Sequence, residues 1–401
     1  MNIVVQKYGG TSVGSIEKIK FVAKRVINEK KKGNEVVVVV SAMGKTTDNL
    51  INMSKEICNN PNKRELDMLL STGEQMSISL LSMALEAEGY KSISLTGFQA
   101  GIKTQGLHTK NKISDIDSEK VKKYLQDEKI VVVAGFQGIN EEGDITTLGR
   151  GGSDTTAVAL AAKLKCPCEI YTDVDGIYSI DPRVYKEAKK IDYISYEEMM
   201  EMATLGAGVM DARAVEIGCK YNVPIYVALN NGEIKGTWIK EYDERMEERV
   251  ITGLTISENN LMITINNVLF KSNNIARIFE RLAQSFINID MISQTAPVNG
   301  YVNVSFTASK DDLEIIKDVI TKINDEIRGI DVSIELDITK VSVIGIGMMN
   351  QSGVTSKVFK IFADNDIEFK QVTTSEISIS FAIDSKDKQK AANVLAKELN
   401  L

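Results

Sequence analysis

The feature that most constrains the fold is an alternation, over residues 1–230, between short apolar runs and longer segments with helical periodicity. The clearest run, EVVVVVSA at residues 35–42, is typical of a strand buried on both faces of a parallel sheet. A helical apolar period ends at Gly33, and another covers residues 65–88. Further strand patterns occupy residues 2–7, 91–96, 129–136, 168–172 and 224–229. This order predicts a three-layer αβα fold around a mostly parallel sheet, with ligands at the carboxyl ends of the strands.

Composition excludes several classes of function. The chain has 401 residues, which predicts more than one domain, and a formal net charge of −7, which argues against nucleic acid as the main partner. No run approaches the roughly 20 apolar residues of a membrane span, and the cysteines lack redox or zinc spacing, so the cytoplasm is the expected compartment. The single histidine, His108, is expected in a loop. A Ser–His triad, a histidine-rich metal site and a histidine general base are therefore nearly excluded.

The stretch VVQKYGGTSVGS, residues 4–15, places Lys7 at the end of the first predicted strand. The backbone N–H groups of Gly9, Gly10 and Thr11 are expected to be free to point at phosphate oxygens, which Lys7 reaches as a point charge. In a P-loop the lysine follows the glycines, so this stretch is a different kind of turn. It predicts an anion site, and a purely structural strand-to-helix turn is the alternative.

A second glycine-rich segment, TTLGRGGSDTTAVALAAKL at residues 146–164, leads into a helix expected to begin at Ser153 or Asp154. The first N–H groups of a helix bind anions, and Arg150 can hold a carboxylate through two parallel hydrogen bonds. Asp154 is interpreted as a helix cap, as a charge that positions Lys7, or as both. The density of glycine and polar residues favours a functional site.

Other segments carry polar residues near predicted strand ends. In YTDVDGIYSIDPR, residues 171–183, the aspartates do not have the spacing of a calcium loop, which favours a loop against a nucleotide with Tyr178 beside the base and Arg183 near the phosphates. The segment VVSAMGKTTDNL, residues 39–50, follows the second strand. In STGEQMS, Glu74 lies within a mostly apolar helix. Because a buried unpaired carboxylate is costly, Glu74 is expected to face a cation, with a structural salt bridge as the alternative.

The charged segment EYDERMEERV, residues 241–250, lacks an apolar period and is the expected domain boundary. Beyond it, RIFERLAQSFINIDMISQT from Arg277 and KVFKIFADNDIEFKQVTTS from Lys357 repeat one pattern, an amphipathic helix followed by a strand. The repeat predicts two small β-α-β-β units, at residues 251–335 and 336–401.

Taken together, the blocks KYGGTSVGS, VSAMGKTTD, STGEQMS, TTLGRGGSDTTA and YTDVDGIYSIDPR resemble, in order and separation, those of the aspartokinases. The repeat resembles the two regulatory ACT units of that family, so the likeness covers essentially the whole chain. It implies an α/β fold: a three-layer amino-acid kinase domain, carbamate kinase-like, at residues 1–245, followed by two α+β ferredoxin-like ACT units.

The resemblance implies a role for each matching residue. Lys7 would stabilise the transferring γ-phosphoryl group, and Asp154 would hold Lys7 in place. Glu74 would take the substrate's ammonium. The implied substrate-binding residues are Ser41, Thr47, Glu74, Arg150, Gly151, Gly152 and Ser153. The implied nucleotide-binding residues are Lys7, Tyr8, Gly9, Gly10, Thr172, Asp173, Tyr178, Arg183, Gly208 and Val209. Asp290 and Thr295 would bind an amino-acid effector.

The implied reaction is ATP-dependent phosphorylation of the side-chain carboxylate of L-aspartate to 4-phospho-L-aspartate, the first step towards lysine, threonine and methionine. That carboxylate has a pKa of about 3.9 and is already ionised, so no general base is needed. Mg²⁺ would ride on the ATP phosphates without a dedicated protein site. Lysine or threonine would inhibit through the ACT units, which would also join chains into a homo-oligomer.

Two other functions stay open. One is a kinase of the same superfamily that acts on a different substrate, for instance a glutamate 5-kinase. The other is a catalytically weak amino-acid sensor, suggested by Gly208, which stands where the family has a lysine near the nucleotide. The missing cation predicts weaker ATP binding or slower turnover, or compensation by a nearby lysine such as Lys189. Because Lys7, Arg150 and Asp154 are all present, an active enzyme is favoured.

Two further positions depart from the family pattern. Asp211-Ala212 replaces a His-Pro pair, and Asn273-Asn274 replaces Pro-Gly in the first ACT unit, where asparagine can keep a positive φ. Asp290 and its repeat partner Lys370 differ in charge, which indicates that the two units are not equivalent sites.

Overall fold

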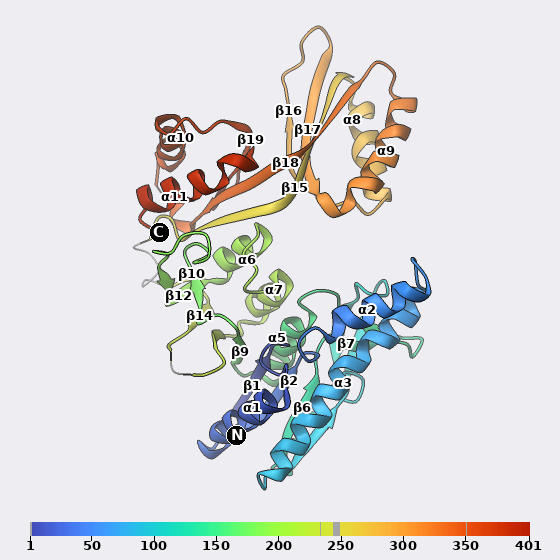
Figure 1. The fold of residues 1–401 in the computed structure, drawn as a ribbon, viewed down its shortest axis with the longest axis vertical. Coiled ribbons are helices and arrows are strands. Elements are labelled where there is room, and N and C mark those ends of the chain that lie inside the picture. Colours follow the sequence, from blue (N-terminus) through green and yellow to red (C-terminus); the bar gives the residue numbers. More distant parts are fainter. Residues whose placement is uncertain (1, 233, 244–248, 350) are drawn as a thin grey trace. The chain divides into compact units, whose positions relative to one another are not determined.

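The computed structural model describes residues 2–232, 234–243, 249–349 and 351–401. The chain divides into two compact units (Figure 1). The first comprises residues 1–177, 190–203 and 208–246, and the second comprises residues 178–189, 204–207 and 247–401. The expected linker, residues 241–250, lies partly outside the described residues, and the expected end of the kinase domain at residue 245 lies wholly outside them. The domain boundaries therefore stay predictions.

The first unit is built on an eight-stranded sheet of order β12-β14-β13-β9-β1-β2-β6-β3. Its strands are β1 (Ile3–Tyr8), β2 (Glu35–Val40), β3 (Ser92–Leu95), β6 (Ile130–Ala134), β9 (Cys168–Thr172), β12 (Tyr193–Ser195), β13 (Ile225–Leu229) and β14 (Thr237–Lys240). Neighbours from β3 to β13 run parallel, and only the β13–β14 pairing in this sheet is antiparallel among the described strands. The run at 35–42 is confirmed as a central strand, with every residue from Val36 to Val40 buried.

Helices cover both faces of this sheet, as the alternation predicts. The helices of this unit are α1 (Ile16–Lys31), α2 (Thr46–Ile57), α3 (Lys63–Ala87), α4 (Glu119–Gln126), α5 (Gly152–Leu164), α6 (Tyr196–Thr204, whose last residue falls in the second unit) and α7 (Ala212–Tyr221). The apolar sides of α1 and α3 form one core with alternate residues of β1, β2 and β6. Helix α5 packs on β1 and against α7 on the other face. Because side chains alternate along a strand, Tyr8 faces the α1–α3 core while Lys7 faces α5.

A smaller four-stranded sheet, of order β5-β4-β7-β8, lies within the same unit. Its strands are β4 (Ile102–Gln105), β5 (Lys112–Ile116), β7 (Gln137–Ile139) and β8 (Ile145–Thr147). The loop after β8 leads directly into α5, so this sheet determines where residues 148–151 lie.

The second unit contains one six-stranded sheet of order β16-β17-β15-β18-β20-β19. Its strands are β15 (Gly253–Leu269), β16 (Ile289–Gln294), β17 (Tyr301–Ser309), β18 (Asp331–Ile344), β19 (Phe369–Thr374) and β20 (Ser378–Asp384). Its helices are α8 (Ser272–Gln284), α9 (Leu313–Glu326), α10 (Val354–Asp364) and α11 (Lys388–Glu398). Along the chain, the assignment changes from the first to the second unit within β10 (Ile177–Tyr178) and returns to the first unit at the start of β11 (Lys190–Ile191).

The two expected repeats share the long strands β15 and β18. The first residues of β15 pair with the last residues of β18, for example Leu254 with Val343, and Leu254 lies in the hydrophobic cluster of α10 and α11. The later part of β15, including Leu261, belongs to the cluster of α8 and α9. The sequence repeat therefore does not reveal that the first strand contributes to both cores.

One local expectation in this unit is wrong. Asn273 and Asn274 do not adopt a positive φ, because both lie in the first turn of α8. The equivalent helix of the second repeat begins after Gly353, whose φ is 96°. The two repeats therefore enter their first helices differently.

Candidate active site

The centre of the candidate site is an ion pair between β1 and the first turn of α5. Lys7 Nζ lies 2.6 Å from Asp154 Oδ1, and the exposed fractions of the two side chains are only 10% and 12%. The residue before α5 is Gly151, with no side-chain cap, so Asp154 is not the helix cap. The alternative in which Asp154 holds Lys7 is the one that the geometry supports.

The turn before α5 is held from α7. Gly151 has a φ of 73°, and a Cβ at this residue would lie 2.3 Å from Asp211 Oδ2, so only glycine fits. Asp211 caps α7 through Arg213 N–H (3.1 Å). Arg213 Nη2 donates to the carbonyl oxygens of Leu148 (2.8 Å) and Arg150 (3.0 Å). The Asp211-Ala212 departure from the family pattern thus forms part of the support of this turn.

The glycines after β1 differ from the expectation at one position. Gly9 N–H is not free, because it donates to Tyr171 O at 3.2 Å. No hydrogen bond from Gly10 N–H or Thr11 N–H is present within the described residues. Gly10 packs on the segment after β2, where its added Cβ would lie 2.7 Å from Ala42 O, and its carbonyl oxygen accepts from Gly44 N–H at 2.9 Å. The two segments therefore form one surface at the carboxyl ends of β1 and β2.

Glu74 reaches this surface from α3. Its exposed fraction is 2%, and its Oε1 accepts a hydrogen bond from Ala42 N–H at 3.1 Å. Its Oε2 has no hydrogen-bond partner in the part of the chain that the structure describes. The structural salt bridge proposed as an alternative is therefore not formed. Burial raises the pKa of Glu74 to about 8, as expected for a carboxyl group that forms no ion pair within the described residues.

The remaining implied substrate residues lie around the same strand ends. Ser41 directly follows β2 and donates its N–H to Tyr8 O at 3.2 Å, and Thr47 lies in the first turn of α2. Gly152 and Ser153 begin α5. A Cβ on Gly135, at the end of β6, would lie 2.8 Å from Ser153 Oγ, so the start of α5 packs directly on that strand end.

The implied nucleotide residues fall into two groups. In the first unit, Thr172 ends β9 and its hydroxyl donates to Asp173 Oδ1 at 3.1 Å. Tyr8 is fully buried and stacks on Tyr171 with centroids 5.1 Å apart, so its side chain is part of the core. Tyr178 and Arg183 belong to the second unit, where Arg183 Nη2 pairs with Asp181 at 2.6 Å. Their placement beside a nucleotide stays a prediction.

Gly208 is exposed, and a Cβ at this residue would meet no atom within 4 Å. Val209, its neighbour, is half-buried. The lysine expected to compensate for Gly208 is engaged elsewhere, because Lys189 Nζ donates to the carbonyl oxygen (2.7 Å) and Oδ1 (2.6 Å) of Asn400. Lys189 is therefore a poor candidate for that role.

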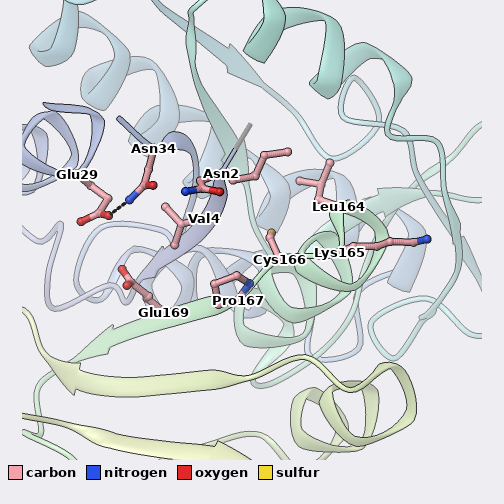
Figure 2. Close-up of a pocket in the computed structure, with 10 residues that line it drawn as sticks. Asn2, Val4, Glu29, Asn34, Leu164, Lys165, Cys166, Pro167 and Glu169 are labelled. Carbon is pink, nitrogen blue, oxygen red and sulfur yellow. Dashed lines mark hydrogen bonds between the residues drawn. The ribbon is translucent and has the colours of Figure 1, made fainter. Parts of the chain in front are cut away.

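No group of three or more His, Cys, Asp or Glu side chains that could hold a metal ion occurs among the described residues. A cavity of about 390 Å³ lies at the amino-terminal ends of β1 and β9, lined by Asn2, Glu29, Cys166 and Glu169 among others (Figure 2). Glu29 there accepts from the side-chain amide of Asn34, and burial raises the pKa of the Cys166 thiol to about 12. This cavity lies at the amino-terminal ends of the strands, whereas Lys7 lies near the carboxyl end of β1. The cavity is therefore not part of the candidate site.

Comparison with known proteins identifies the family. The sequence model of the Amino acid kinase family matches residues 2–229. An aspartokinase of Geobacillus stearothermophilus is 50% identical over 387 residues, which cover 96% of this chain and 94% of that protein. Aspartokinase 2 of Bacillus subtilis is 46% identical, covering 98% and 97%. The chain belongs to the aspartokinase family. It is therefore an enzyme, a phosphotransferase.

Solved structures agree with the aspartokinase fold. A crystal structure of E. coli aspartokinase III in complex with aspartate and ADP covers 100% of both chains with a TM-score of 0.83, and at 24% identity this shows the fold alone. An aspartate kinase from Synechocystis is 38% identical, with a TM-score of 0.55, and the match covers 99% of this chain and 69% of that one. The α/β kinase domain followed by ferredoxin-like units is confirmed. Across the described ranges, no helix is long and apolar enough to cross a membrane.

A family model of the ACT domain matches residues 341–399. The implied effector residue Asp290 forms an ion pair with Lys340, whose side chain is only 4% exposed. Thr295 is tied to Asn303, with its N–H donating at 3.0 Å and its hydroxyl accepting at 3.0 Å. Lys370, the repeat partner of Asp290, pairs with Glu335 and with Asp384 (2.9 Å). The two repeat positions thus carry opposite charges with different partners.

Sequence reasoning missed one buried cluster of the aspartokinase domain. Asp67, on α3, has no exposed surface and accepts hydrogen bonds from His108 Nδ1 (2.7 Å) and Thr109 N–H (3.0 Å). His108 is in a loop, as expected, but its ring is held by a carboxylate. The signal that could have revealed the cluster is the spacing of Asp67 and Glu74 on one face of the same helix.

Proposed function

We propose that this protein uses ATP to phosphorylate the side-chain carboxylate of L-aspartate, forming 4-phospho-L-aspartate, the first step towards lysine, threonine and methionine. The observation that carries the proposal is Glu74, a buried carboxylate with one unpartnered oxygen beside the segment that follows β2. A substrate ammonium would complete its hydrogen bonding and favour its ionised form. The relatives are named for aspartate phosphorylation, which is the reaction that this arrangement suits.

The carboxylates of the substrate are assigned to the start of α5 and to α2. Arg150 and Ser153 would hold them, with Thr47 in the first turn of α2 and Ser41 lining the same pocket. Ser153 lies in the first turn of α5, and a helix N-terminus favours a negative charge, whereas the Gly152 N–H already donates to Gly149 O at 3.1 Å. Gly151 packs closely on Asp211 and Gly152 on Leu148 and Phe136, which fixes the position of that end of the helix.

The phosphoryl group would bind at the glycine turn after β1. The Lys7 ammonium and the N–H groups of Gly10 and Thr11 are suited to an anion, and Asp154 holds Lys7 in place. Thr172 and Asp173, at the end of β9, would contact the rest of the nucleotide, together with Val209. When bound to ATP, Mg²⁺ would neutralise phosphate charge.

The chain's own residues would then contribute placement and charge neutralisation. The attacking carboxylate needs no base, because it is ionised at neutral pH. Holding its ammonium at Glu74 and its α-carboxylate at Arg150 leaves the side-chain carboxylate to face the phosphoryl group beside Lys7. Negative charge that spreads over the transferring group is stabilised by Lys7 and the turn N–H groups.

The second unit would make the reaction responsive to an end product. Asp290 would take the ammonium of lysine or threonine, with Thr295 nearby, and the unit would join chains into a homo-oligomer. Exposed apolar side chains on β16, β17 and the loop between them (Ile292, Val298 and Tyr301) support an interface there, and β16 is an edge strand. The cytoplasm remains the expected compartment.

Turnover with purified protein tests the proposal. Mg·ATP with L-aspartate should release ADP in a coupled assay, and hydroxylamine should trap the acyl phosphate as a hydroxamate. Faster turnover with L-glutamate would instead favour the glutamate kinase alternative. Tight binding of an amino acid by calorimetry, without ADP release, would favour the sensor alternative that Gly208 motivates.

A further inference from the structure

The buried cluster around Asp67 lies between α3 and the loop that carries Arg150. Asp67 accepts from His108 Nδ1, from Thr109 N–H with both oxygens (3.1 and 3.0 Å), and from the hydroxyl of Thr147. Thr147 is the last residue of β8 and is fully buried. The carboxylate therefore joins a helix, a loop and a strand end.

Thr109 has an unusual backbone conformation. Its φ is 70°, in the left-handed region that β-branched residues seldom adopt. Such a conformation costs free energy and persists only where its surroundings hold it. Here the surroundings are the two oxygens of Asp67, which receive the Thr109 N–H in the middle of the strained turn.

The strained turn at Thr109 lies against the Gly149–Arg150 turn that precedes α5. A Cβ on Gly149 would lie 3.1 Å from Thr109 O, so the backbones of the two residues are in contact. Asn111 N–H donates to Thr147 O at 3.0 Å, which fastens the turn to the end of β8. Arg150 follows Gly149 directly, and its carbonyl oxygen is held from the other side by Arg213.

The Asp67 carboxylate is also linked, through α3, to Glu74, the residue proposed to hold the ammonium of the substrate. Asp67 and Glu74 lie about two turns apart on one face of α3, and both are buried. A shift of the Asp67 contacts would therefore change the separation between Glu74 and the Gly149–Arg150 turn. None of the cluster residues Asp67, His108 and Thr109 is among the residues proposed to bind ATP.

We propose that Asp67, His108 and Thr109 form a positioning clamp that sets the affinity for aspartate by fixing the Arg150 turn relative to Glu74. The clamp rests on the proposed function, since Arg150 and Glu74 are its aspartate ligands. It predicts an effect on the amino-acid substrate and none on ATP.

The main test is the His108→Ala variant, because His108 is 24% exposed and its loss should leave the fold intact. The KM for aspartate should rise at least about tenfold, the effect of losing one hydrogen bond to a charged group, while the KM for ATP stays unchanged. His108→Asn retains an N–H donor toward Asp67 and should restore most of the affinity. Asp115→Asn, in an exposed ion pair with Lys163 (3.1 Å), is the matched control and should have no effect.

A second variant pair tests the strained turn itself. Asp67→Asn should weaken aspartate binding, and adding Thr109→Gly should recover part of the loss, because glycine holds a positive φ without help. If Asp67→Asn does not fold, the His108 variants decide the question. The single histidine also gives one imidazole signal by NMR, which should shift on saturation with L-aspartate and not with ATP.

Three results would overturn the clamp. They are an unchanged KM for aspartate in folded His108→Ala, an equal rise in the KM for aspartate and the KM for ATP, or an imidazole NMR signal that does not shift when aspartate is added. Absence of wild-type turnover with L-aspartate would count against the proposed function instead. In that case the dissociation constant for aspartate replaces KM, with the same expected change. If the wild-type protein neither turns over nor binds aspartate, both proposals fail.

Discussion

The Lys7 ammonium lies 2.6 Å from the Asp154 carboxylate, which joins the first strand of the sheet to the first turn of α5. Both side chains are nearly buried, so each depends on the other for charge compensation. Because α5 also begins the proposed carboxylate site, this one pair links the phosphoryl end of the site to the substrate end.

Lys7→Met should lower kcat by about 10²–10³-fold, the typical effect of removing one group that stabilises charge in the transition state. The variant leaves Asp154 buried without its cation, which should also destabilise the protein by about 3–5 kcal/mol. Steady-state kinetics and thermal unfolding measure the two effects. Lys163→Met removes an exposed lysine and should change neither quantity. A Lys7→Met enzyme with normal kcat would remove Lys7 from the mechanism.

Glu74 should make aspartate binding depend on pH. Its pKa of about 8 means that the free enzyme holds it protonated at pH 7, whereas an ammonium ligand requires the carboxylate. The KM for aspartate should therefore fall as the pH rises towards 8. Binding at pH 7 should release about one proton, which calorimetry in buffers of different ionisation enthalpy detects.

The same raised pKa affects stability with a definite sign. A carboxyl group that binds its proton more tightly in the folded state stabilises the protein below its unfolded pKa, and this stability is lost as the pH rises through about 8. Glu74→Gln should remove that loss, so its Tm relative to wild type should increase between pH 5 and pH 8. A pH-independent difference in Tm would contradict the assignment.

Gly208→Lys should improve ATP binding. A side chain at this exposed position meets no atom within 4 Å, and the added charge would restore the family's lysine. One charge-assisted contact is worth about 1.5–3 kcal/mol, so the KM for ATP should fall about tenfold or more. Gly208→Met, of similar length without the charge, is the control. If both variants behave like wild type, the position does not contact the nucleotide.

Asp290→Ala should abolish inhibition by the effector and leave basal turnover intact. The substitution also leaves the buried Lys340 ammonium without the Asp290 carboxylate, so the protein should be less stable. Adding Lys340→Met should restore stability without restoring inhibition, which separates the two effects. Inhibition assays with lysine and threonine, read beside thermal unfolding, make the comparison. Inhibition that survives in Asp290→Ala would place the effector elsewhere.

Ile292→Lys should reduce the mass of the oligomer in solution. Ile292 is 49% exposed on the edge strand β16, where a charge would oppose the pairing of two chains. Light scattering measures the mass. Ile315→Lys, at a position on α9 with 47% exposure, is the control and should keep the wild-type mass. An unchanged mass for Ile292→Lys would move the interface to another surface.

Local patterns in the sequence were sufficient to predict the main secondary-structure elements and the order of the motifs along the chain. The apolar run at 35–42 became β2, the helical pattern at 65–88 became α3, and Lys7 and Arg150 lie at strand or helix ends as predicted. These features depend on residues that are close in sequence, where the periods of 2 and 3.6 apply.

Only the tertiary structure decided which partners those residues have. In the folded chain, Lys7 pairs with Asp154, and one oxygen of Glu74 has no partner within the described residues. The Gly9 N–H donates to Tyr171 O, and His108 is hydrogen-bonded to Asp67. The tertiary structure also paired the start of β15 with the end of β18, which the tandem repeat conceals. Each of these contacts joins segments far apart in the chain. Their partners depend on strand order and register, which no periodicity within one segment records.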